Sequence, residues 1–438
     1  MKMASNSKKW CYFFQLVLLC LTLLLQIASN QIEAGGSKVE YLPGFDGPLP
    51  FQLETGYVGL GDSEDDMQVF YYFIKSENDS KNDPLLLWLS GGPGCSSFCG
   101  FIYQIGPMKL KVEEYDGSLP KLISRPQSWT KVANIIFVDL PMGTGFSYAK
   151  NVIPHRSDWK VVHQTHRFIR KWLAENPDLI INGYILGNPV TSGLEHNDQI
   201  PYVHGMGLIS DELYWSLQNT CHGNIINVDS TNKPCLNDMQ YYYELLENIE
   251  LLNLLEIYCV DENIKGTRQN PRRSLAQKIK APLSSPVTLP DMRCQIYGGF
   301  LLMEWINDPA VRKALHIREG TIGKWNWCYG DDYVFEIPSS VPFHANLSAK
   351  GYPSLIYSGD HDALVPFSST QRWIRSLNYS ILDDWRPWYL NDQVAGYTRT
   401  YSNQMTFATI RGGSHTPQDT KPDESFVMFV RWISNKPL

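Results

Sequence analysis

A run of apolar residues that ends abruptly in glycine and proline constrains this chain more than any other feature. Leu85–Leu89 is followed directly by the sequence SGGPG at Ser90–Gly94. Five apolar residues between breakers are typical of a fully buried strand in a parallel sheet. The glycines then require backbone angles that neither a strand nor a helix provides. Free N–H groups at such a turn lie where α/β proteins bind ligands and could hold a developing oxyanion, although a purely structural turn is the alternative.

Strand and helix patterns alternate along most of the remaining chain. Strands are expected at 67–74, 134–139, 183–187, 354–357 and 405–410, and helices at 159–175, 308–315, 366–375 and 424–434. This alternation predicts an α/β fold with a mostly parallel central sheet. The stretch 202–297 differs, because it has a Leu- and Glu-rich helical pattern at 238–259 and a polar stretch around 262–289. We interpret it as an inserted helical lid that contains an exposed linker.

The first residues have the features of a secretory signal. Lys2, Lys8 and Lys9 precede an apolar run at about 10–27, and small and polar residues follow. We therefore expect a signal peptide at 1–29, with its end between 29 and 36, and a mature domain at 37–438. A stable membrane anchor is the alternative that we reject. Three N-glycosylation sequons agree with an extracellular or vacuolar glycoprotein, at Asn78, Asn346 and Asn378.

The cysteines also indicate an oxidising compartment. Of nine cysteines, Cys11 and Cys20 lie in the expected signal, which leaves seven. Seven cysteines predict three disulfides and one free thiol, and the spacing alone does not give the pairing.

Several classes of function are disfavoured by what the sequence lacks. The net charge is −7 and there is no basic stripe, which argues against nucleic-acid binding. No Walker, dinucleotide or HExxH motif occurs, so we expect no cofactor and no metal. His163 and His166 are spaced for one helix face, but we interpret them as a surface pair. The oligomeric state is left open.

Two polar loops follow late strands and indicate catalysis. Asp362 comes just after the strand at 354–357, and His415 comes just after the strand at 405–410. This is the second half of the order Ser…Asp…His found in α/β-hydrolases. The acid would hold the imidazole in one tautomer, and the imidazole would take a proton from a serine.

Seven long strings together identify the chain as similar to a known family. They are GGPGCSS, PMGTGFSYA, GYILGNPVT, HGMGLISDELY, NDPAVRKALHI, IYSGDHDALVPF and GGSHT. The chain resembles the plant serine carboxypeptidase-like proteins, and more closely their branch of acyltransferases that use glucose esters in secondary metabolism. The resemblance spans about Val39–Leu438. It implies an α/β-hydrolase fold with a helical lid, a small acyl ester or a peptide as substrate, and a Ser-Asp-His triad.

The resemblance also assigns individual residues. Asp362 would be the triad acid, His415 the base and Gly92 an oxyanion-hole donor, with Ser90 and Gly91 beside the substrate. Ser90 stands where the carboxypeptidases have an asparagine that binds the peptide carboxylate, which favours an acyltransferase ancestry. The implied disulfides leave Cys99 free and are Cys95–Cys328, Cys221–Cys235 and Cys259–Cys294.

One departure from the family pattern concerns the nucleophile. The family's serine lies in a G-[DE]-S-Y-[AGS]-G elbow, and this chain has no such string between the helix at 159–175 and the strand at 183–187. Ser147 belongs to another motif, and Ser192 has no elbow around it. A strand, elbow and helix would amount to about 30–40 residues. We expect this loss to leave two neighbouring strands unpaired, or paired in a new register.

The function expected from the sequence follows from this departure. By family, the protein is a serine-type carboxypeptidase, hydrolase or acyltransferase. The chain itself is expected to be inactive or a variant isoform. The alternatives are a non-catalytic binding protein and a truncated gene model of an active peptidase.

Overall fold

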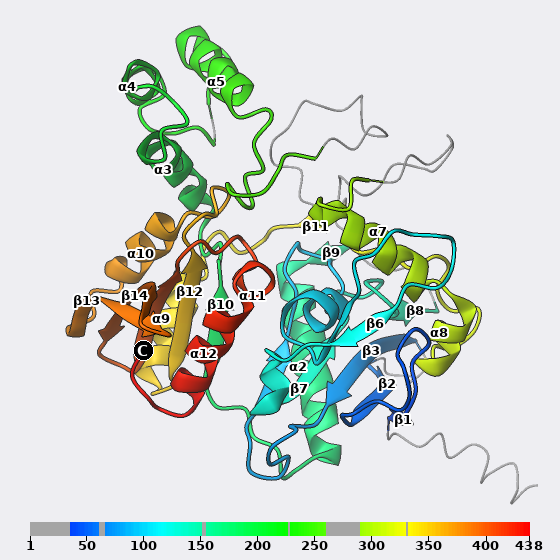
Figure 1. Ribbon diagram of the computed structural model, residues 1–438. Helices are drawn as coiled ribbons and strands as arrows, with labels where there is room; N and C mark the ends of the chain where they lie inside the picture. Colours follow the sequence, from blue (N-terminus) through cyan, green and yellow to red (C-terminus); the bar gives the residue numbers. More distant parts are fainter. Residues whose placement is uncertain (1–35, 61–65, 151–154, 227, 260–289, 330–331) are drawn as a thin grey trace, which may run out of the picture. The chain divides into compact units, whose positions relative to one another are not determined.

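The structure is a computed structural model that describes residues 36–60, 66–150, 155–226, 228–259, 290–329 and 332–438 (Figure 1). Lys38–Leu438 form one unit. The expected signal peptide and the linker at 262–289 lie outside the described residues. No helix within the described ranges combines the length and the hydropathy that a bilayer crossing needs.

The first half of the chain builds a mixed sheet around β3. Its strands, in spatial order, are β1 (Ser37–Val39), β2 (Leu53–Gly59), β3 (Met67–Ile74), β7 (Asn134–Val138) and β4 (Leu85–Trp88), and β8 (Tyr148–Ala149) also pairs with β3. The long aromatic and β-branched strand β3 is almost entirely buried, as such residues favour.

A second sheet contains the strands that carry the acid and the histidine. Its order is β10 (Tyr184–Gly187), β12 (Ser354–Gly359), β15 (Met405–Ile410), β14 (Gln393–Tyr401) and β13 (Ile381–Leu390). β10, β12 and β15 are mutually parallel, so their carboxyl ends meet at one edge.

The α/β fold agrees with the sequence prediction, but the expectation of a mostly parallel sheet is too simple. The inner pairs β4–β7, β10–β12 and β12–β15 are parallel. β3 and β7 are antiparallel, and the pairs β13–β14 and β14–β15 are antiparallel because short turns connect their strands. β13 and β14, for example, are joined through Asn391 and Asp392, which both have positive φ (49° and 58°). Two such residues form the tight hairpin turn that matches strand twist.

The strand at the start of the glycine turn is less buried than the sequence predicts. β4 has only Leu85 fully buried, while Leu86, Leu87 and Trp88 are half-buried. The physical reason is that, among the strands that the structure describes, β4 pairs with β7 alone. β10 likewise has β12 as its one partner in the described ranges, and its residues are half-buried or exposed. The two described sheets therefore end at β4 and β10 without pairing to each other, which is the first of the two outcomes expected above.

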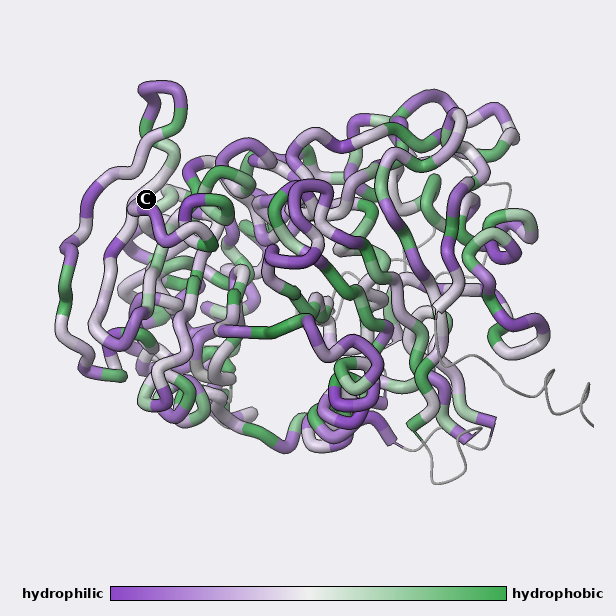
Figure 2. The backbone as a smooth tube through the Cα atoms, turned by 90° about the horizontal axis from the view of Figure 1, so that it is seen from below, coloured by the Kyte–Doolittle hydropathy of each residue, from purple (hydrophilic) through white to green (hydrophobic). Residues whose placement is uncertain are grey.

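The hydrophobic core is continuous on one face of the two sheets and divided on the other. One cluster combines Phe137 of β7 with Tyr357 of β12 and is covered by α12 (Pro422–Ile433) and α7 (Gln295–Ile306). On the opposite face, α2 (Asp158–Glu175) packs on the first sheet and α10 (Phe367–Ser376) packs on the second, in two separate clusters. Figure 2 shows the chain running from α2 to β10 between these two groups.

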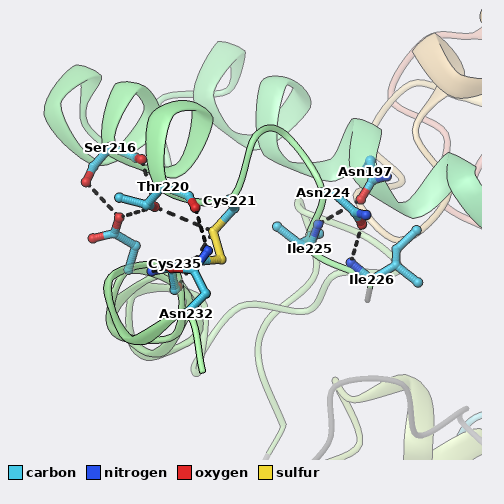
Figure 3. The surroundings of a disulfide bond; sticks show 10 residues. Asn197, Ser216, Thr220, Cys221, Asn224, Ile225, Ile226, Asn232 and Cys235 are labelled. Carbon is cyan, nitrogen blue, oxygen red and sulfur yellow. Dashed lines mark hydrogen bonds between the residues drawn. A yellow bond between two sulfur atoms is a disulfide. The ribbon is translucent and has the colours of Figure 1, made fainter. Parts of the chain in front are cut away.

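A helical insertion follows β10 and has a small core of its own. It consists of α3 (Gln199–Gly205), α4 (Asp211–Thr220) and α5 (Lys233–Leu245), which pack through Leu213, Leu217, Met239 and Tyr242. Figure 3 shows how α4 and α5 are joined: Cys221 bonds Cys235, and Ser216 and Thr220 both donate 2.7 Å hydrogen bonds to Asp238. The insertion begins at Gln199, slightly before the expected start at Tyr202.

The helix expected at 238–259 is partly wrong. The structure ends α5 at Leu245, and turns follow to about residue 258. Backbone groups that a helix would use internally instead bind the loops that carry Asp362 and His415. Tertiary hydrogen bonds therefore override the helical pattern here.

The remaining described elements are short or peripheral. They are β5 (Met108–Leu110), β6 (Leu122–Ser124), β9 (Arg156–Ser157), β11 (Tyr333–Val334), α8 (Pro309–Ala314), α9 (Val341–Ala349), α11 (Pro417–Thr420) and the helical turns Gly100–Gln104, Trp129–Lys131 and Gly193–Asp198.

Candidate active site

Asp362 and His415 meet as the sequence predicts. Each residue follows a strand of the second sheet, and His415 Nδ1 lies 2.7 Å from Asp362 Oδ2. Asp362 is fully buried, while about a third of the His415 side chain is exposed. A carboxylate in this position would fix the imidazole with its other nitrogen free to take a proton. Within the described part of the chain, Asp362 is the one hydrogen-bond partner of that imidazole.

The carboxylate of Asp362 is held by three further donors. Its Oδ1 accepts hydrogen bonds from the backbone N–H groups of Leu364 and Val365, both at 2.9 Å. Its Oδ2 also accepts a 2.8 Å bond from Asn188 Nδ2. A buried carboxylate needs such donors to remain ionised without water.

Asn188 is a site residue that the sequence analysis did not single out. It directly follows β10 with a positive φ of 44°, and its Oδ1 accepts a bond from Gly359 N–H at the end of β12. Asparagine is one of the few residues that adopt this conformation readily. Its position after a strand in the string GYILGNPVT was the signal that could have revealed it.

The pKa of His415 depends on a balance. Burial alone would lower this pKa, but the charge of Asp362 and the hydrogen bond between the two side chains outweigh burial, so the pKa is raised. The imidazolium form is therefore favoured by its partner, as a general base requires once it has accepted a proton.

The turns after α5 cover the loops that carry this pair. The backbone N–H of His415 donates to Leu252 O at 2.7 Å, and that of Leu254 donates to His361 O at 3.0 Å. Leu251 O accepts from both Ala363 and Leu364. The helical insertion is thus attached directly to the acid and histidine loops.

The glycine turn after β4 adopts a conformation that only glycine tolerates. Gly92 has a φ of +142°, and a Cβ there would lie 2.7 Å from Cys95 Sγ. Gly91 and Gly92 are exposed. No hydrogen bond to the Gly92 N–H occurs among the described residues, which leaves this donor free for a ligand. Ser90 lies beside it, half-buried, and its hydroxyl accepts a 3.2 Å bond from Trp88 Nε1.

A buried carboxylate supports this turn from beneath. Asp139 follows β7 and is fully buried, and its Oδ1 accepts bonds from Ser96 Oγ at 2.6 Å and Ser97 N–H at 3.0 Å. Its Oδ2 accepts a 3.1 Å bond from Phe146 N–H. Burial raises the pKa of Asp139 to about 6, although these hydrogen bonds lower it. Asp139 therefore joins the turn at 90–97 to the PMGTGFSYA segment.

Replacing Asp139 with asparagine is expected to change how stability depends on pH. Because the folded pKa of about 6 exceeds the ordinary value of 3.8, Asp139 stabilises the fold most below pH 4, and this contribution is lost as the pH rises to 6. We expect the free energy of unfolding of the wild type, relative to Asp139→Asn, to fall by about 3 kcal/mol between about pH 3 and pH 7. Urea titrations of both proteins would measure it, and a constant difference would contradict it.

The serines considered as alternatives do not form a triad with His415 here. Ser147 is fully buried, and its hydroxyl donates to Asp139 O at 2.7 Å and accepts from Phe70 N–H at 2.8 Å. Ser192 is half-buried and forms a β-bridge with Ser339. His163 and His166 are exposed on α2, and no group of three metal-binding side chains occurs in the described ranges.

The disulfides and sequons occupy accessible or supporting positions. The structure contains Cys95–Cys328, Cys221–Cys235 and Cys259–Cys294, the pairs that the resemblance implied, and Cys99 is a buried free thiol. These bonds are compatible with the secretory pathway. The asparagines of the three sequons, Asn78, Asn346 and Asn378, are all exposed.

An acid and a histidine at two neighbouring strand ends of the second sheet, together with a glycine turn on the edge strand of the first sheet, give this protein the α/β-hydrolase fold. The crystal structure of Kex1Δp, a prohormone-processing carboxypeptidase from Saccharomyces cerevisiae, has the same fold, with a TM-score of 0.68 and 20% identity over 91% of this chain and 95% of that one. The chain belongs to the serine carboxypeptidase family, which it matches over residues 43–182 and 177–435, and within it to the plant serine carboxypeptidase-like proteins.

Relatives from Arabidopsis thaliana match nearly the whole chain. Serine carboxypeptidase-like 11 is 45% identical over 97% of this chain and 100% of its own length. Serine carboxypeptidase-like 12 is 46% identical over 95% of this chain and 98% of its own length. The first comparison runs over 463 positions, more than the 438 residues of this chain, so it includes positions where this chain has no residue.

Proposed function

We propose that this chain is a catalytically inactive member of its family that retains the acid, the base and half of the oxyanion hole but has no nucleophilic serine. The observation that carries the proposal is the interruption of the sheet between β4 and β10. The first sheet ends with the parallel pair β7–β4, and the second begins with the parallel pair β10–β12. One more parallel strand between β4 and β10 would join the two into a single sheet. The nucleophile of an α/β-hydrolase follows such a central strand.

The two family matches support the same location. They meet and overlap at 177–182, which is the connection between α2 and β10. The sequence there contains no glycine-flanked serine. A family member interrupted at this point loses the strand, the elbow and the following helix together.

The ancestral reaction is acyl transfer through a covalent serine ester. His415 would take the proton of the serine, Asp362 would stabilise the imidazolium, and the Gly92 N–H would donate to the oxyanion of the tetrahedral intermediate. His415 would give that proton to the alcohol that leaves the donor ester as its C–O bond breaks, and the acyl group would then pass from the serine to water or to an acceptor alcohol. Ser90 in place of asparagine supports an acyltransferase ancestry over a peptidase, with a small acyl ester as donor.

A second candidate follows from the same interruption. The intact flanking motifs also fit a truncated gene model, or a variant transcript, of an active enzyme in the secretory pathway. The exposed sequon asparagines and the disulfides support a glycosylated extracellular or vacuolar protein in either case.

Labelling with a serine-reactive fluorophosphonate tests the proposal. We expect no labelling of the natural chain. We expect labelling of a chimera that receives, between Pro177 and Gly183, the intervening segment of Arabidopsis serine carboxypeptidase-like 11. The rate of labelling in the chimera should fall at least 1,000-fold in the His415→Ala variant, since the general base activates the serine.

Two results would contradict the proposal. Labelling of the natural chain that is lost in His415→Ala would mean that a serine already present acts as nucleophile. A folded chimera whose labelling does not depend on His415 would mean that the Asp362–His415 pair is not a catalytic one.

A further inference from the structure

The edges of β4 and β10 that no described strand pairs, here called the opening, present backbone groups for a further strand. The N–H of Asn134 in β7 donates to Pro84 O, directly before β4. Because backbone direction alternates along a strand, the N–H groups of Leu85 and Leu87 point away from β7. The Leu85 N–H donates a 3.3 Å hydrogen bond to Ile180 O in the α2–β10 connection. Leu87 N–H therefore points to the open edge.

The edge of β10 follows the same rule. Tyr184 N–H donates to Pro353 O and Asn188 N–H donates to Tyr357 O, both in the direction of β12. Because backbone direction alternates along a strand, the N–H groups of Ile185 and Gly187 point away from β12. An edge with such groups is a template for a further strand.

The divided core indicates that a helix is needed as well as a strand. On the face covered by α2 and α10 the two hydrophobic clusters are separate, whereas the opposite face has one continuous cluster. Large apolar side chains are exposed nearby, on α2 (Val162), in the connection (Ile180, 70% exposed) and on α9 (Phe343). A helix with an apolar stripe would bury such side chains.

We propose that the opening between β4 and β10 is a docking site for a βα segment of a second polypeptide chain: a strand parallel to its neighbours, followed by an amphipathic helix. The proposal rests on the proposed function. The relatives indicate the occupant, because they have residues where this chain has none and the family match is interrupted at 177–182, beside this opening. Main-chain hydrogen bonds would supply affinity, and the apolar stripe would supply specificity.

A binding experiment with the whole chain tests this proposal without any catalysis. The probe is a fluorescein-labelled synthetic peptide, the segment of Arabidopsis serine carboxypeptidase-like 11 that lies between the residues aligned with Pro177 and Gly183. We expect saturable binding by fluorescence anisotropy. Hydrogen exchange at Leu87, Ile185 and Gly187 should slow at least tenfold when the peptide is bound.

A matched pair of proline variants locates the site. Ile185→Pro removes an N–H that points into the opening and leaves the N–H groups that donate to β12 in place. This variant should bind the peptide at least tenfold more weakly. Leu382→Pro, on the outer edge strand β13, should leave the affinity unchanged. Thermal unfolding of both variants verifies that they fold.

Three results would overturn the proposal: no saturable binding, equal binding by the wild type and Ile185→Pro, or protection confined to other strands. Self-association of the chain through these edges, seen by sedimentation without peptide binding, would assign the surface to a second copy instead. Failure of the proposed function is a separate result, because it is read from fluorophosphonate labelling of the natural chain.

Discussion

Replacing Cys95 and Cys328 together with alanine is expected to lower the free energy of unfolding by about 5 kcal/mol. The bond closes a loop with a sequence separation of 233, so it removes much conformational freedom from the unfolded chain. It also fixes the glycine turn, because Ser96 N–H donates to Trp327 O and Tyr329 N–H donates to Gly94 O. Urea unfolding of oxidised wild type and variant, with refolding verified, would measure the difference.

The bond within the helical insertion provides the control. Cys221–Cys235 has a sequence separation of only 14, and replacing that pair should cost about 3 kcal/mol. Hydrogen exchange of the turn at Ser90–Gly94 should increase in the first variant and not in the second. Equal losses of stability, with no change at the turn, would contradict this account of the Cys95–Cys328 bond.

Replacing Asp362 with asparagine should destabilise the protein by about 3–5 kcal/mol and lower the pKa of His415. Four donors are directed at this buried carboxylate, and an amide can accept from only some of them while its own NH₂ faces the others. The charge that raises the pKa of His415 is also lost. Urea unfolding and NMR titration of the imidazole would measure the two effects.

The sign of the pH dependence follows from the raised pKa. The stabilisation that protonated His415 gains from Asp362 is fully present below the ordinary pKa of 6.5 and is lost as the pH rises through the raised folded value. Asp360→Asn is the matched control. This half-buried carboxylate of the same loop binds Gly412 N–H and His361, and its loss should leave the pKa of His415 unchanged. An unchanged His415 pKa in Asp362→Asn would contradict the assignment.

The parts of this site that the sequence predicts are those fixed by local rules. The apolar run at 85–88, the strand that ends before Asp362 and the strand that ends before His415 all appear where periodicity and breakers place them. Because carboxyl ends of neighbouring parallel strands share one edge of a sheet, the meeting of acid and histidine was predictable from the order of the elements.

What the sequence did not reveal depends on contacts between distant segments. The hairpin β13–β14 was missed because Pro387 and several charged residues obscure its alternation, although Asn391–Asp392 is a recognisable turn. Asn188 matters because of a carboxylate 174 residues away. The turns at 246–258 replace a helix because their carbonyl groups bind the loops of Asp362 and His415. No window of local sequence contains these partners.

The pairing of β10 has a consequence for how the protein is made. Tyr184 pairs with Ser354, so a ribosome that has released β10 must add about 170 more residues before its neighbour exists. At 5–20 residues per second this takes roughly 10–30 s. During that time both edges of β10 are open, and after folding one edge is still paired by no described strand. The nascent chain therefore needs chaperones that bind exposed strands. It needs them for longer than a chain whose strands pair in the order in which they are synthesised.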